Sequence, residues 1–251
     1  MDPSEHSYGH KIIQEVMGQV IQRTGNALLK ESVSQPSLPK GTRRNNTQQY
    51  LVSSFMSVKR MINETDGIFF ITITCYNWIP LLEIGNAYNA VYKWFNYLKD
   101  KGHYITGYVI MPNHFHFLIA FSKTDKNINK IIGNGKRFLA YEIIKLLKDT
   151  NNISILKQLA EALEATDRKK GKLHEVFEDS FDIKECLTSK FMTQKLNYIH
   201  NNPCSGKWML ANCSENYLHS SAKFYSTGKQ LLFPVTHIQE LVDIDLNESL
   251  L

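Results

Sequence analysis

The stretch Ile110-Met111-Pro112-Asn113-His114-Phe115-His116-Phe117-Leu118-Ile119 decides how the rest of this chain is read. Its apolar and aromatic residues predict a β-strand, on which alternate side chains point to opposite faces of a sheet. We therefore expect two groups of side chains: His114, His116 and Leu118 on one face, and Phe115, Phe117 and Ile119 in a core. Two imidazoles on one face, about 7 Å apart along the strand, can converge on one cation. The same pattern also fits two polar, solvent-facing strand residues, so the pair alone does not decide its role.

Composition is typical of a soluble globular protein, with 251 residues of which 43% are hydrophobic and 21% charged. No apolar run approaches the roughly 18 residues of a membrane span, and we expect neither a signal peptide nor a membrane partner. The four cysteines form no CxxC pair, which favours reduced thiols in the cytoplasm over a cysteine zinc cluster. The net charge of +5 is compatible with nucleic-acid binding without being diagnostic of it.

The chain is expected to have three parts. Residues 1–60 form an N-terminal extension, in which Ile12, Val16 and Val20 recur at helical spacing before a polar linker over 33–49. Residues 61–233 form the main domain, with an inserted helical segment near 149–172. Residues 234–251 form an acidic C-terminal tail.

Within the main domain, the apolar patterns predict strands over 68–76, 104–111, 114–121 and 176–186. Helices are expected between the first two strands, over 128–147 and over 187–199. Pro112 and Asn113 supply turn chemistry between the second and third strands. The order β-α-β-β-α-β-α predicts an α+β fold: a ferredoxin-like split β-α-β sheet with helices on one face and an extra C-terminal helix.

A second polar feature lies on that last helix, in Asn197-Tyr198-Ile199-His200-Asn201-Asn202-Pro203. Gln194 lies one turn before Tyr198 and Asn202 one turn after it, so the three can form a polar row. A phenol oxygen can act as a nucleophile, and an amide oxygen suits a hard cation such as Mg²⁺ or Mn²⁺. His200 faces away from Tyr198 by helical geometry.

Together, VIMPNHFHFLI and LNYIHNNP resemble the signatures of the single-tyrosine HUH transposases, and most closely those of the REP-associated tyrosine transposase branch. The resemblance covers roughly residues 68–225. It implies that His114, His116 and Asn202 bind Mg²⁺ or Mn²⁺ and that Tyr198 is the nucleophile. It also implies cleavage and rejoining of hairpin-adjacent single-stranded DNA through a 5′-phosphotyrosine. The expected setting is bacterial and nucleoid-associated, and monomer and homodimer both stay open.

Other residues are candidates for DNA contact. Arg168, Lys169 and Lys170 lie in the insertion, where compact members of the family have little, and they could bind phosphate or merely decorate the surface. Gln194 lies beside the tyrosine. Trp208 and Tyr217 could stack on unpaired bases, or could hold the C-terminal segment onto the core.

Three other functions compete with this one. A small nucleic-acid-binding sheet would use Phe115 and Phe117 to stack bases, but it leaves the histidine face unexplained. A histidine-triad hydrolase would need a third histidine where Leu118 stands. A former transposase, catalytically silent and kept for DNA binding, would retain the same fold.

Overall fold

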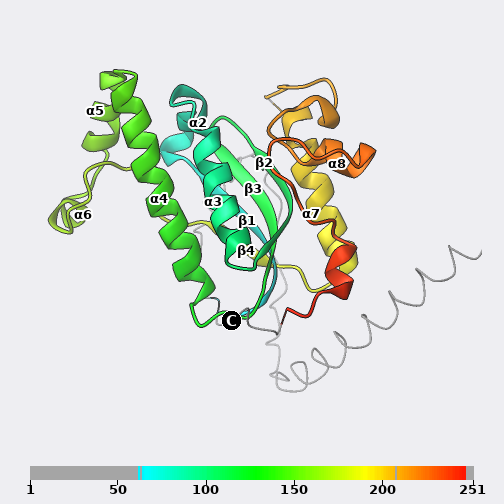
Figure 1. The fold of residues 1–251 in the computed structure, drawn as a ribbon. Helices are drawn as coiled ribbons and strands as arrows, with labels where there is room; N and C mark the ends of the chain where they lie inside the picture. Colours follow the sequence, from blue (N-terminus) through cyan, green and yellow to red (C-terminus); the bar gives the residue numbers. More distant parts are fainter. Residues whose placement is uncertain (1–61, 63, 207, 247–251) are drawn as a thin grey trace, which may run out of the picture. The chain divides into compact units, whose positions relative to one another are not determined.

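A computed structural model describes residue 62, residues 64–206 and residues 208–246 (Figure 1). The chain divides into two units, Met1–Val58 and Lys59–Leu251. The amphipathic helix and polar linker predicted for residues 1–60 lie outside the described residues. The fold below is therefore that of the second unit.

Four strands form one antiparallel sheet in the spatial order β2-β3-β1-β4. They are β1 (Gly67–Thr74), β2 (Tyr104–Ile110), β3 (His114–Phe121) and β4 (Asp182–Glu185). Helices connect β1 to β2 and β3 to β4, whereas a tight turn at Pro112 and Asn113 joins β2 to β3. This is the split β-α-β arrangement, so the predicted α+β fold is confirmed.

Helices α3 (Tyr88–Asp100) and α4 (Ile128–Asp149) cover one face of the sheet (Figure 1). Phe115 and Phe117 point to this face and are fully buried among the apolar sides of these helices. Helix α4 runs unbroken through its two glycines. A Cβ at Gly135 would collide with the indole of Trp94, so the glycine allows α3 and α4 to pack closely.

The opposite face of the sheet is covered by α7 (Ser189–Asn201), whose first turn is capped by the Thr188 hydroxyl accepting from the Phe191 amide. Leu118 and Ile199 belong to a second apolar cluster on this face. A Cβ at Gly107 would collide with Leu196, so β2 and α7 come into close contact where that glycine lies. The helix predicted over 187–199 is thus present and lies against the histidine face.

The segment between α4 and β4 differs from the prediction. Residues 149–172 include the helices α5 (Ile153–Glu161) and α6 (Ala165–Lys169), and that the segment is an insertion stays a prediction. The strand predicted over 176–186 was too long: β4 has four residues, preceded by one isolated bridge between Cys75 and Phe177. Between the two, the Lys136 ammonium donates to the carbonyls of Glu178 and Asp179.

The C-terminal segment packs on the same unit. It includes η3 (Ser214–Asn216), α8 (Ala222–Thr227) and η4 (Glu240–Asp243), while α2 (Leu81–Ile84) and the turns η1 (Tyr76–Trp78) and η2 (Asn202–Cys204) complete the elements. Val235 and Leu241 are buried, and the Thr236 amide donates to the carbonyl of Ile105. Residues 234–246 therefore pack on the domain and do not form a separate acidic tail, because their apolar side chains Val235 and Leu241 are buried.

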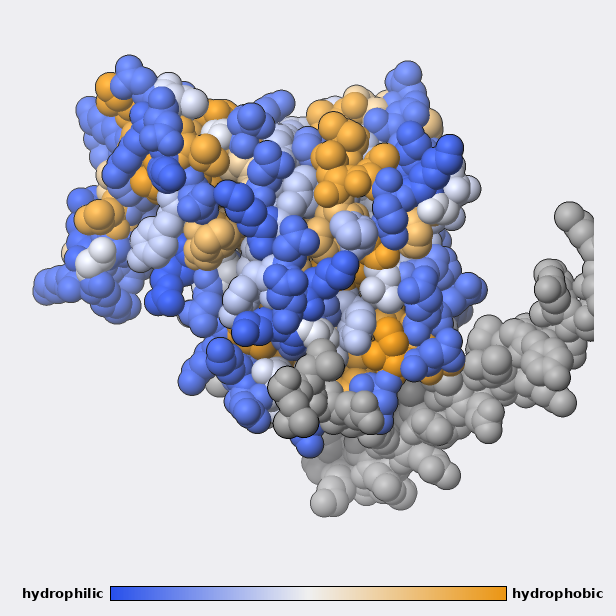
Figure 2. All heavy atoms as spheres, in the orientation of Figure 1, coloured by the Kyte–Doolittle hydropathy of each residue, from blue (hydrophilic) through white to orange (hydrophobic). Residues whose placement is uncertain are grey.

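The face of the molecule seen in Figure 2 is mostly hydrophilic, with apolar patches separated by hydrophilic side chains. Within the described residues, no helix has both the length and the apolar character that crossing a membrane requires.

Candidate functional site

The two histidines of β3 lie together on the face covered by α7. They pair with β1 in a register that sets His114 opposite Thr74 and His116 opposite Thr72. Their ring centroids are 4.8 Å apart with an interplanar angle of 76°. Both side chains are buried, so the solvent-facing alternative does not hold.

Each histidine is held through its Nδ1 atom. Nδ1 of His114 lies 2.7 Å from Oδ1 of Asn113, and the amide's orientation is fixed because its Nδ2 donates to the carbonyl of Trp78 at 2.9 Å. An amide oxygen only accepts, so Nδ1 of His114 carries a proton and donates it to Asn113. Hydrogen bonding of one ring nitrogen is how metal-binding histidines are commonly oriented.

His116 has an unsatisfied nitrogen. Its Nδ1 lies 2.8 Å from the hydroxyl of Thr72, whereas its Nε2 is buried without a hydrogen-bond partner among the described residues. A buried polar atom left without a partner costs free energy unless something binds it. Burial, followed by the nearby charges of His114 and Lys195, lowers the pKa of His116 well below its usual 6.5. The ring is therefore neutral at physiological pH, the form that binds metals.

Tyr198 reaches the same place from α7. Its ring meets that of His116 edge-on, with centroids 5.1 Å apart at 66°, and meets Phe70 at 5.9 Å and 78°. The side chain is 50% exposed, so part of the ring packs against these neighbours while the rest is accessible to a substrate. The Lys195 ammonium lies 4.7 Å from the centroid of Phe70 and 5.7 Å from that of Tyr198. This brings a positive charge beside the phenol.

Gln194 and Asn202 extend the row on α7. Gln194 is exposed one turn before Tyr198, and Asn202 is the half-buried C-cap residue with helical dihedral angles, one turn after it. The carbonyl of Asn202 accepts from the Ser205 amide at 3.4 Å. The backbone is therefore helical from Gln194 to Asn202, as the predicted polar row requires.

The donor set fits a divalent metal ion. With their Nδ1 atoms engaged, the two imidazoles would offer Nε2 as the ligand atom, and Nε2 of His116 has no hydrogen-bond partner among the described residues. Asn202 would add an amide oxygen, the type of ligand that Mg²⁺ and Mn²⁺ accept. A set with no charged ligand leaves most of the ion's charge for a phosphate.

The C-terminal candidates lie in contacts of their own. The hydroxyl of Tyr217 donates to the carbonyl of Ile110 at 2.8 Å, and Trp208 is half-buried against the second apolar cluster. His200 is buried away from Tyr198, with Nε2 2.9 Å from the hydroxyl of Ser221, and burial lowers its pKa to about 4. These residues hold the C-terminal segment against the sheet; whether Trp208 and Tyr217 also contact DNA stays a prediction.

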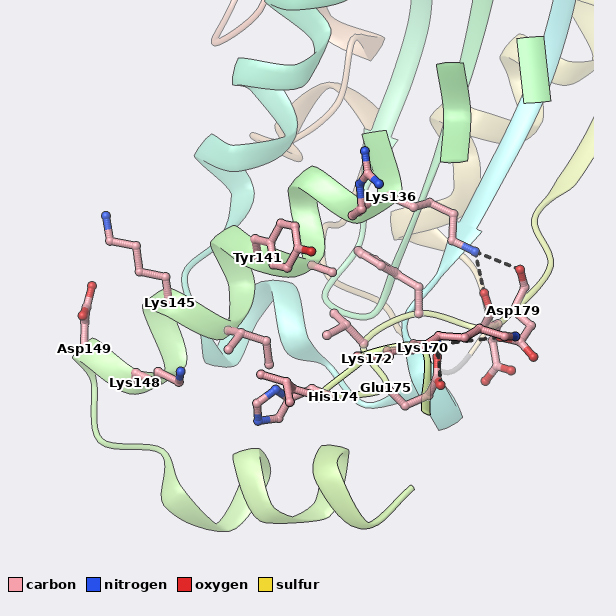
Figure 3. A pocket seen from close by; sticks show the side chains of 18 residues that line it. Lys136, Tyr141, Lys145, Lys148, Asp149, Lys170, Lys172, His174, Glu175 and Asp179 are labelled. Carbon is pink, nitrogen blue, oxygen red and sulfur yellow. Dashed lines mark hydrogen bonds and ion pairs between the residues drawn. The ribbon is translucent and has the colours of Figure 1, made fainter. Parts of the chain in front are cut away.

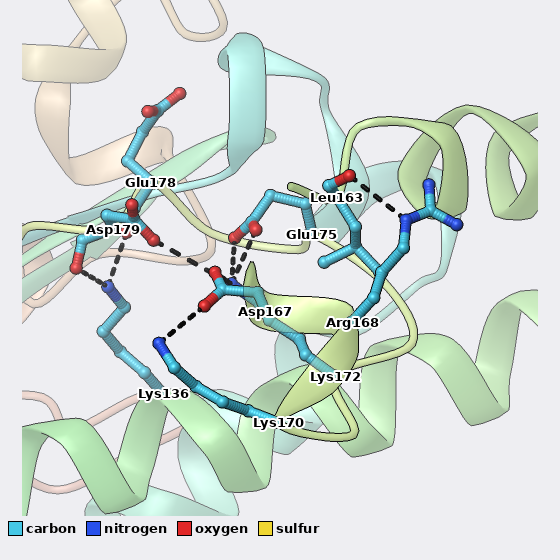
Figure 4. A network of polar contacts seen from close by, with 9 residues as sticks. All are labelled: Lys136, Leu163, Asp167, Arg168, Lys170, Lys172, Glu175, Glu178 and Asp179. Atoms are coloured by element: carbon cyan, nitrogen blue, oxygen red, sulfur yellow. Dashed lines mark hydrogen bonds and ion pairs between the residues drawn. The ribbon is translucent and has the colours of Figure 1, made fainter. Parts of the chain in front are cut away.

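The insertion places its candidate cations in a polar network (Figure 4). The guanidinium of Arg168 donates to the carbonyls of Leu163 and Ala160, and the Lys170 ammonium lies 3.0 Å from a carboxylate oxygen of Asp167. Lys169 is exposed at the end of α6. Arg168 and Lys170 therefore have structural contacts, and a role in DNA binding remains a prediction for all three.

A groove of about 820 Å³ separates α4 from residues 170–179 (Figure 3). Tyr141, Lys145 and Lys148 line its α4 side, and Lys172 and His174 line the opposite side. The groove is positively charged along α4, and it is a second surface on which an anionic polymer could lie.

Three carboxylates near this groove come close enough to hold a metal ion. Asp167, Glu175 and Asp179 have oxygens within 4.8 Å of one another. However, the ammonium of Lys172 lies 2.6 Å from both oxygens of Glu175, 3.8 Å from Asp167 and 3.9 Å from Asp179 (Figure 4). The Lys172 ammonium therefore already lies among the three carboxylates and offsets part of their charge, so the cluster is an ion-pair network.

The residues that orient the histidines were not predicted from the sequence. Asn113 and Thr72 each hold an Nδ1 atom, and Trp78 lies edge-on to His114 with ring centroids 5.5 Å apart. Asn113 was recognised as a turn residue, and only its place directly before His114 could have hinted at a second role. Thr72 and Trp78 gave no signal, because strand pairing and a folded turn bring them to the histidines.

No protein-family model and no curated protein matches the chain. Among solved structures, it is similar to the REP-associated tyrosine transposase bound to a REP hairpin, with a TM-score of 0.47 and 16% identity over 78% of this chain and 99% of the other. It is also similar to a candidate transposase from Deinococcus radiodurans R1, with a TM-score of 0.29 and 11% identity over 57% of this chain and 97% of the other. At these levels the chemistry has to be argued from the side chains themselves.

Proposed function

We propose that this protein is a metal-dependent transposase that cleaves and rejoins single-stranded DNA beside a hairpin through a 5′-phosphotyrosine intermediate. One observation carries the proposal: a buried histidine pair, held by both Nδ1 atoms, lies against the half-exposed ring of Tyr198, and Nε2 of His116 has no hydrogen-bond partner in the described part of the chain. A ligand pair and an accessible phenol in contact are the two parts that phosphodiester transfer to tyrosine needs.

Nε2 of His114, Nε2 of His116 and the amide oxygen of Asn202 would hold the ion, Mg²⁺ or Mn²⁺. When bound, the ion neutralises charge on the non-bridging oxygens of the phosphate under attack. Asn113 and Thr72 keep the two imidazoles in the ligand orientation, so the protein loses little order when the ion binds. The Lys195 ammonium adds a second positive charge where an anionic phosphate would approach Tyr198.

The covalent step exchanges one phosphodiester for another. The phenol oxygen of Tyr198 attacks phosphorus, the bond from phosphorus to the 3′-oxygen breaks, and the departing oxygen leaves as a 3′-hydroxyl. The phenol gives up its proton and the departing oxygen gains one, so no net proton is consumed. The reverse reaction, attack of a 3′-hydroxyl on the phosphotyrosine, rejoins the strand without an external energy source.

The non-catalytic alternative loses its main support in the structure. Phe115 and Phe117 would have to stack on bases, but both are fully buried beneath α3 and α4. The groove along α4 and the cations of the insertion, Arg168, Lys169 and Lys170, remain our candidates for contacts to the hairpin backbone. Gln194 is our candidate for a contact beside the cleaved bond.

A gel assay with labelled hairpin DNA tests the proposal. The full-length protein is incubated with a hairpin carrying single-stranded flanks, with Mn²⁺, with Mg²⁺ or with chelator, and a covalent protein–DNA band is sought. We expect a band that requires the metal and disappears in Tyr198→Phe, while hairpin binding is kept. Tyr97→Phe is the matched control, since Tyr97 is also 50% exposed and lies on α3. A band of normal intensity in Tyr198→Phe would contradict the proposal.

A further inference from the structure

Trp78 is an exposed indole beside the candidate active site. It is 55% exposed, whereas Trp94 is 2% exposed and packed between helices. Its ring lies edge-on to His114 at 5.5 Å and 69°. A large aromatic surface left open next to buried catalytic groups is the kind of platform on which an unpaired base can stack.

The turn that carries Trp78 is held in an unfavourable backbone conformation. Asn77 and Trp78 are consecutive residues with positive φ angles of 47° and 56°, which non-glycine residues rarely adopt. Two long-range hydrogen bonds hold the turn: the Asn77 amide donates to the Glu178 carboxylate at 2.7 Å, and Asn113 donates to the Trp78 carbonyl at 2.9 Å. The indole is thus presented by a fixed turn rather than a loose loop.

Asn113 ties this turn to the histidine pair. Its Nδ2 atom holds the Trp78 carbonyl while its Oδ1 atom holds Nδ1 of His114. One side chain therefore sets the position of the indole relative to the ligand nitrogen. Strain kept at such a place by surrounding contacts is a common property of functional sites.

Four rings form a row across the site. Centroid separations are 5.5 Å from Trp78 to His114, 4.8 Å from His114 to His116 and 5.1 Å from His116 to Tyr198. The histidine pair lies between the two accessible aromatic residues. The order of these contacts leaves Trp78 at the His114 end of the pair and Tyr198 at the His116 end.

We infer that Trp78 stacks on the base of the nucleotide directly 5′ to the cleaved bond, the one that keeps the 3′-hydroxyl. In phosphoryl transfer the attacking and leaving oxygens lie roughly in line through phosphorus. If Tyr198 attacks from α7, the leaving 3′-oxygen and its nucleotide lie towards His114 and Trp78. This inference rests on the proposed function and assigns Trp78 a substrate-binding role in it.

Such a platform favours an unpaired base over a paired one, whatever its identity. Every base has a π-face, so stacking tolerates changes of sequence, while a base inside a duplex already has its faces covered. Trp78 would therefore help to restrict cleavage to the single-stranded flank. It would also hold the 3′-hydroxyl in place for the rejoining step.

Cleavage of DNA with single abasic sites tests the inference. Wild type is expected to lose about 5- to 150-fold in cleavage rate when the nucleotide 5′ to the cut lacks its base. Trp78→Ala is expected to show a similar loss on intact DNA and no further loss on this abasic DNA, with Trp78→Phe in between. Tyr97→Ala, which removes a 50% exposed aromatic on α3, serves as the control and should keep the full abasic effect.

Equal abasic losses in wild type and Trp78→Ala would overturn the inference while leaving the proposed function intact. Absence of any covalent product in wild type would instead remove the proposed function, and the inference with it. Trp78→Ala could also slow cleavage of intact and abasic DNA by the same factor and so keep the abasic loss. That result would assign Trp78 a structural role on His114 and would also overturn the inference.

A binding measurement covers the case in which Trp78→Ala is too slow to assay. In a Tyr198→Phe background, hairpin DNA carrying 2-aminopurine 5′ to the cut is bound in the presence of Mg²⁺. We expect its fluorescence to be quenched on binding, and the quenching to be lost in Trp78→Ala/Tyr198→Phe at saturating protein. Quenching that persists without the indole would contradict stacking by Trp78.

Discussion

Two regions of this protein gather side chains that can bind a metal ion, and they differ in what surrounds those side chains. On the α7 face, His114 and His116 are buried, each is held through Nδ1, and Nε2 of His116 has no partner among the described residues. Near the groove, Asp167, Glu175 and Asp179 surround the ammonium of Lys172. Among the described residues, the first region contains a buried nitrogen without a hydrogen-bond partner, whereas the second already contains the ammonium of Lys172.

The comparison shows why proximity of ligand atoms is weak evidence for a metal site. Carboxylates gather readily around a lysine, and the network then needs nothing further. A buried imidazole nitrogen without a partner has an unmet requirement, and its neighbour Asn113 has no evident reason to fix His114 unless the ring's orientation matters. The distances between ligand atoms do not distinguish the two regions. The burial of the side chains, their hydrogen-bond partners and the fixed orientation of the imidazole rings do.

The largest expected effect comes from removing a ligand of the first region. His116→Ala should weaken Mn²⁺ binding by more than about 100-fold, because even the partners that orient metal ligands are worth about 10- to 100-fold. Titration calorimetry on the full-length protein measures the affinity. Asp179→Asn is the control in the second region and should leave Mn²⁺ binding unchanged. If Asp179→Asn lost Mn²⁺ binding, the metal would bind at the carboxylate cluster and not at the histidines, which would contradict the proposed site.

The next effect comes from the residues that orient the ligands. Thr72→Val removes the hydroxyl that meets Nδ1 of His116 and should weaken Mn²⁺ binding by about 10- to 100-fold. Thr72→Ser keeps the hydroxyl and should bind like wild type. If Thr72→Ser bound Mn²⁺ weakly and Thr72→Val bound it normally, the shape of the side chain, and not the hydrogen bond, would matter at this position.

Acid should destabilise the domain through buried histidines before it affects the carboxylate network. His200 has a pKa lowered to about 4 by burial, so below its usual 6.5 the unfolded state binds more protons and stability falls. Between pH 6.5 and pH 5 this one residue accounts for about 2 kcal/mol of lost unfolding free energy. Asp167 does not contribute in this range, because its pKa lies below the usual 3.8.

Urea unfolding of metal-free wild type and His200→Gln at several pH values checks this expectation. The glutamine variant should show a smaller loss of stability between pH 6.5 and pH 5, while an Asp167→Asn variant should lose as much as wild type. Identical pH profiles for wild type and His200→Gln would show that His200 is not the group responsible.

The smallest effect concerns Lys172 itself. Lys172→Met leaves the largely buried Glu175 without its ion pair and should lower the free energy of unfolding by about 1 kcal/mol, a modest value because the lysine is partly exposed. Mn²⁺ binding at the histidines should be unchanged, as measured by calorimetry. If the variant instead lost the metal site, the two regions would be coupled and the contrast between them would fail.

Much of this site could be predicted from the sequence because its signals are local. Period-two alternation placed His114 and His116 on one face, and helical spacing placed Gln194, Tyr198 and Asn202 in one row. The parts that were missed depend on contacts between distant residues. The Trp78 turn is held by Glu178, 101 positions away from Asn77. The strand predicted over 176–186 is reduced to β4, and the residues before it contact Lys136 of α4.

The position of the covalent bond tests the central claim most directly. Wild-type protein is incubated with Mn²⁺ and hairpin DNA, digested with protease and nuclease, and analysed by mass spectrometry. The account predicts one modified peptide, with a 5′-linked nucleotide on the phenol oxygen of Tyr198, and an upstream fragment ending in a 3′-hydroxyl. A nucleotide on any other residue, or linkage through a 3′-phosphate, would contradict it.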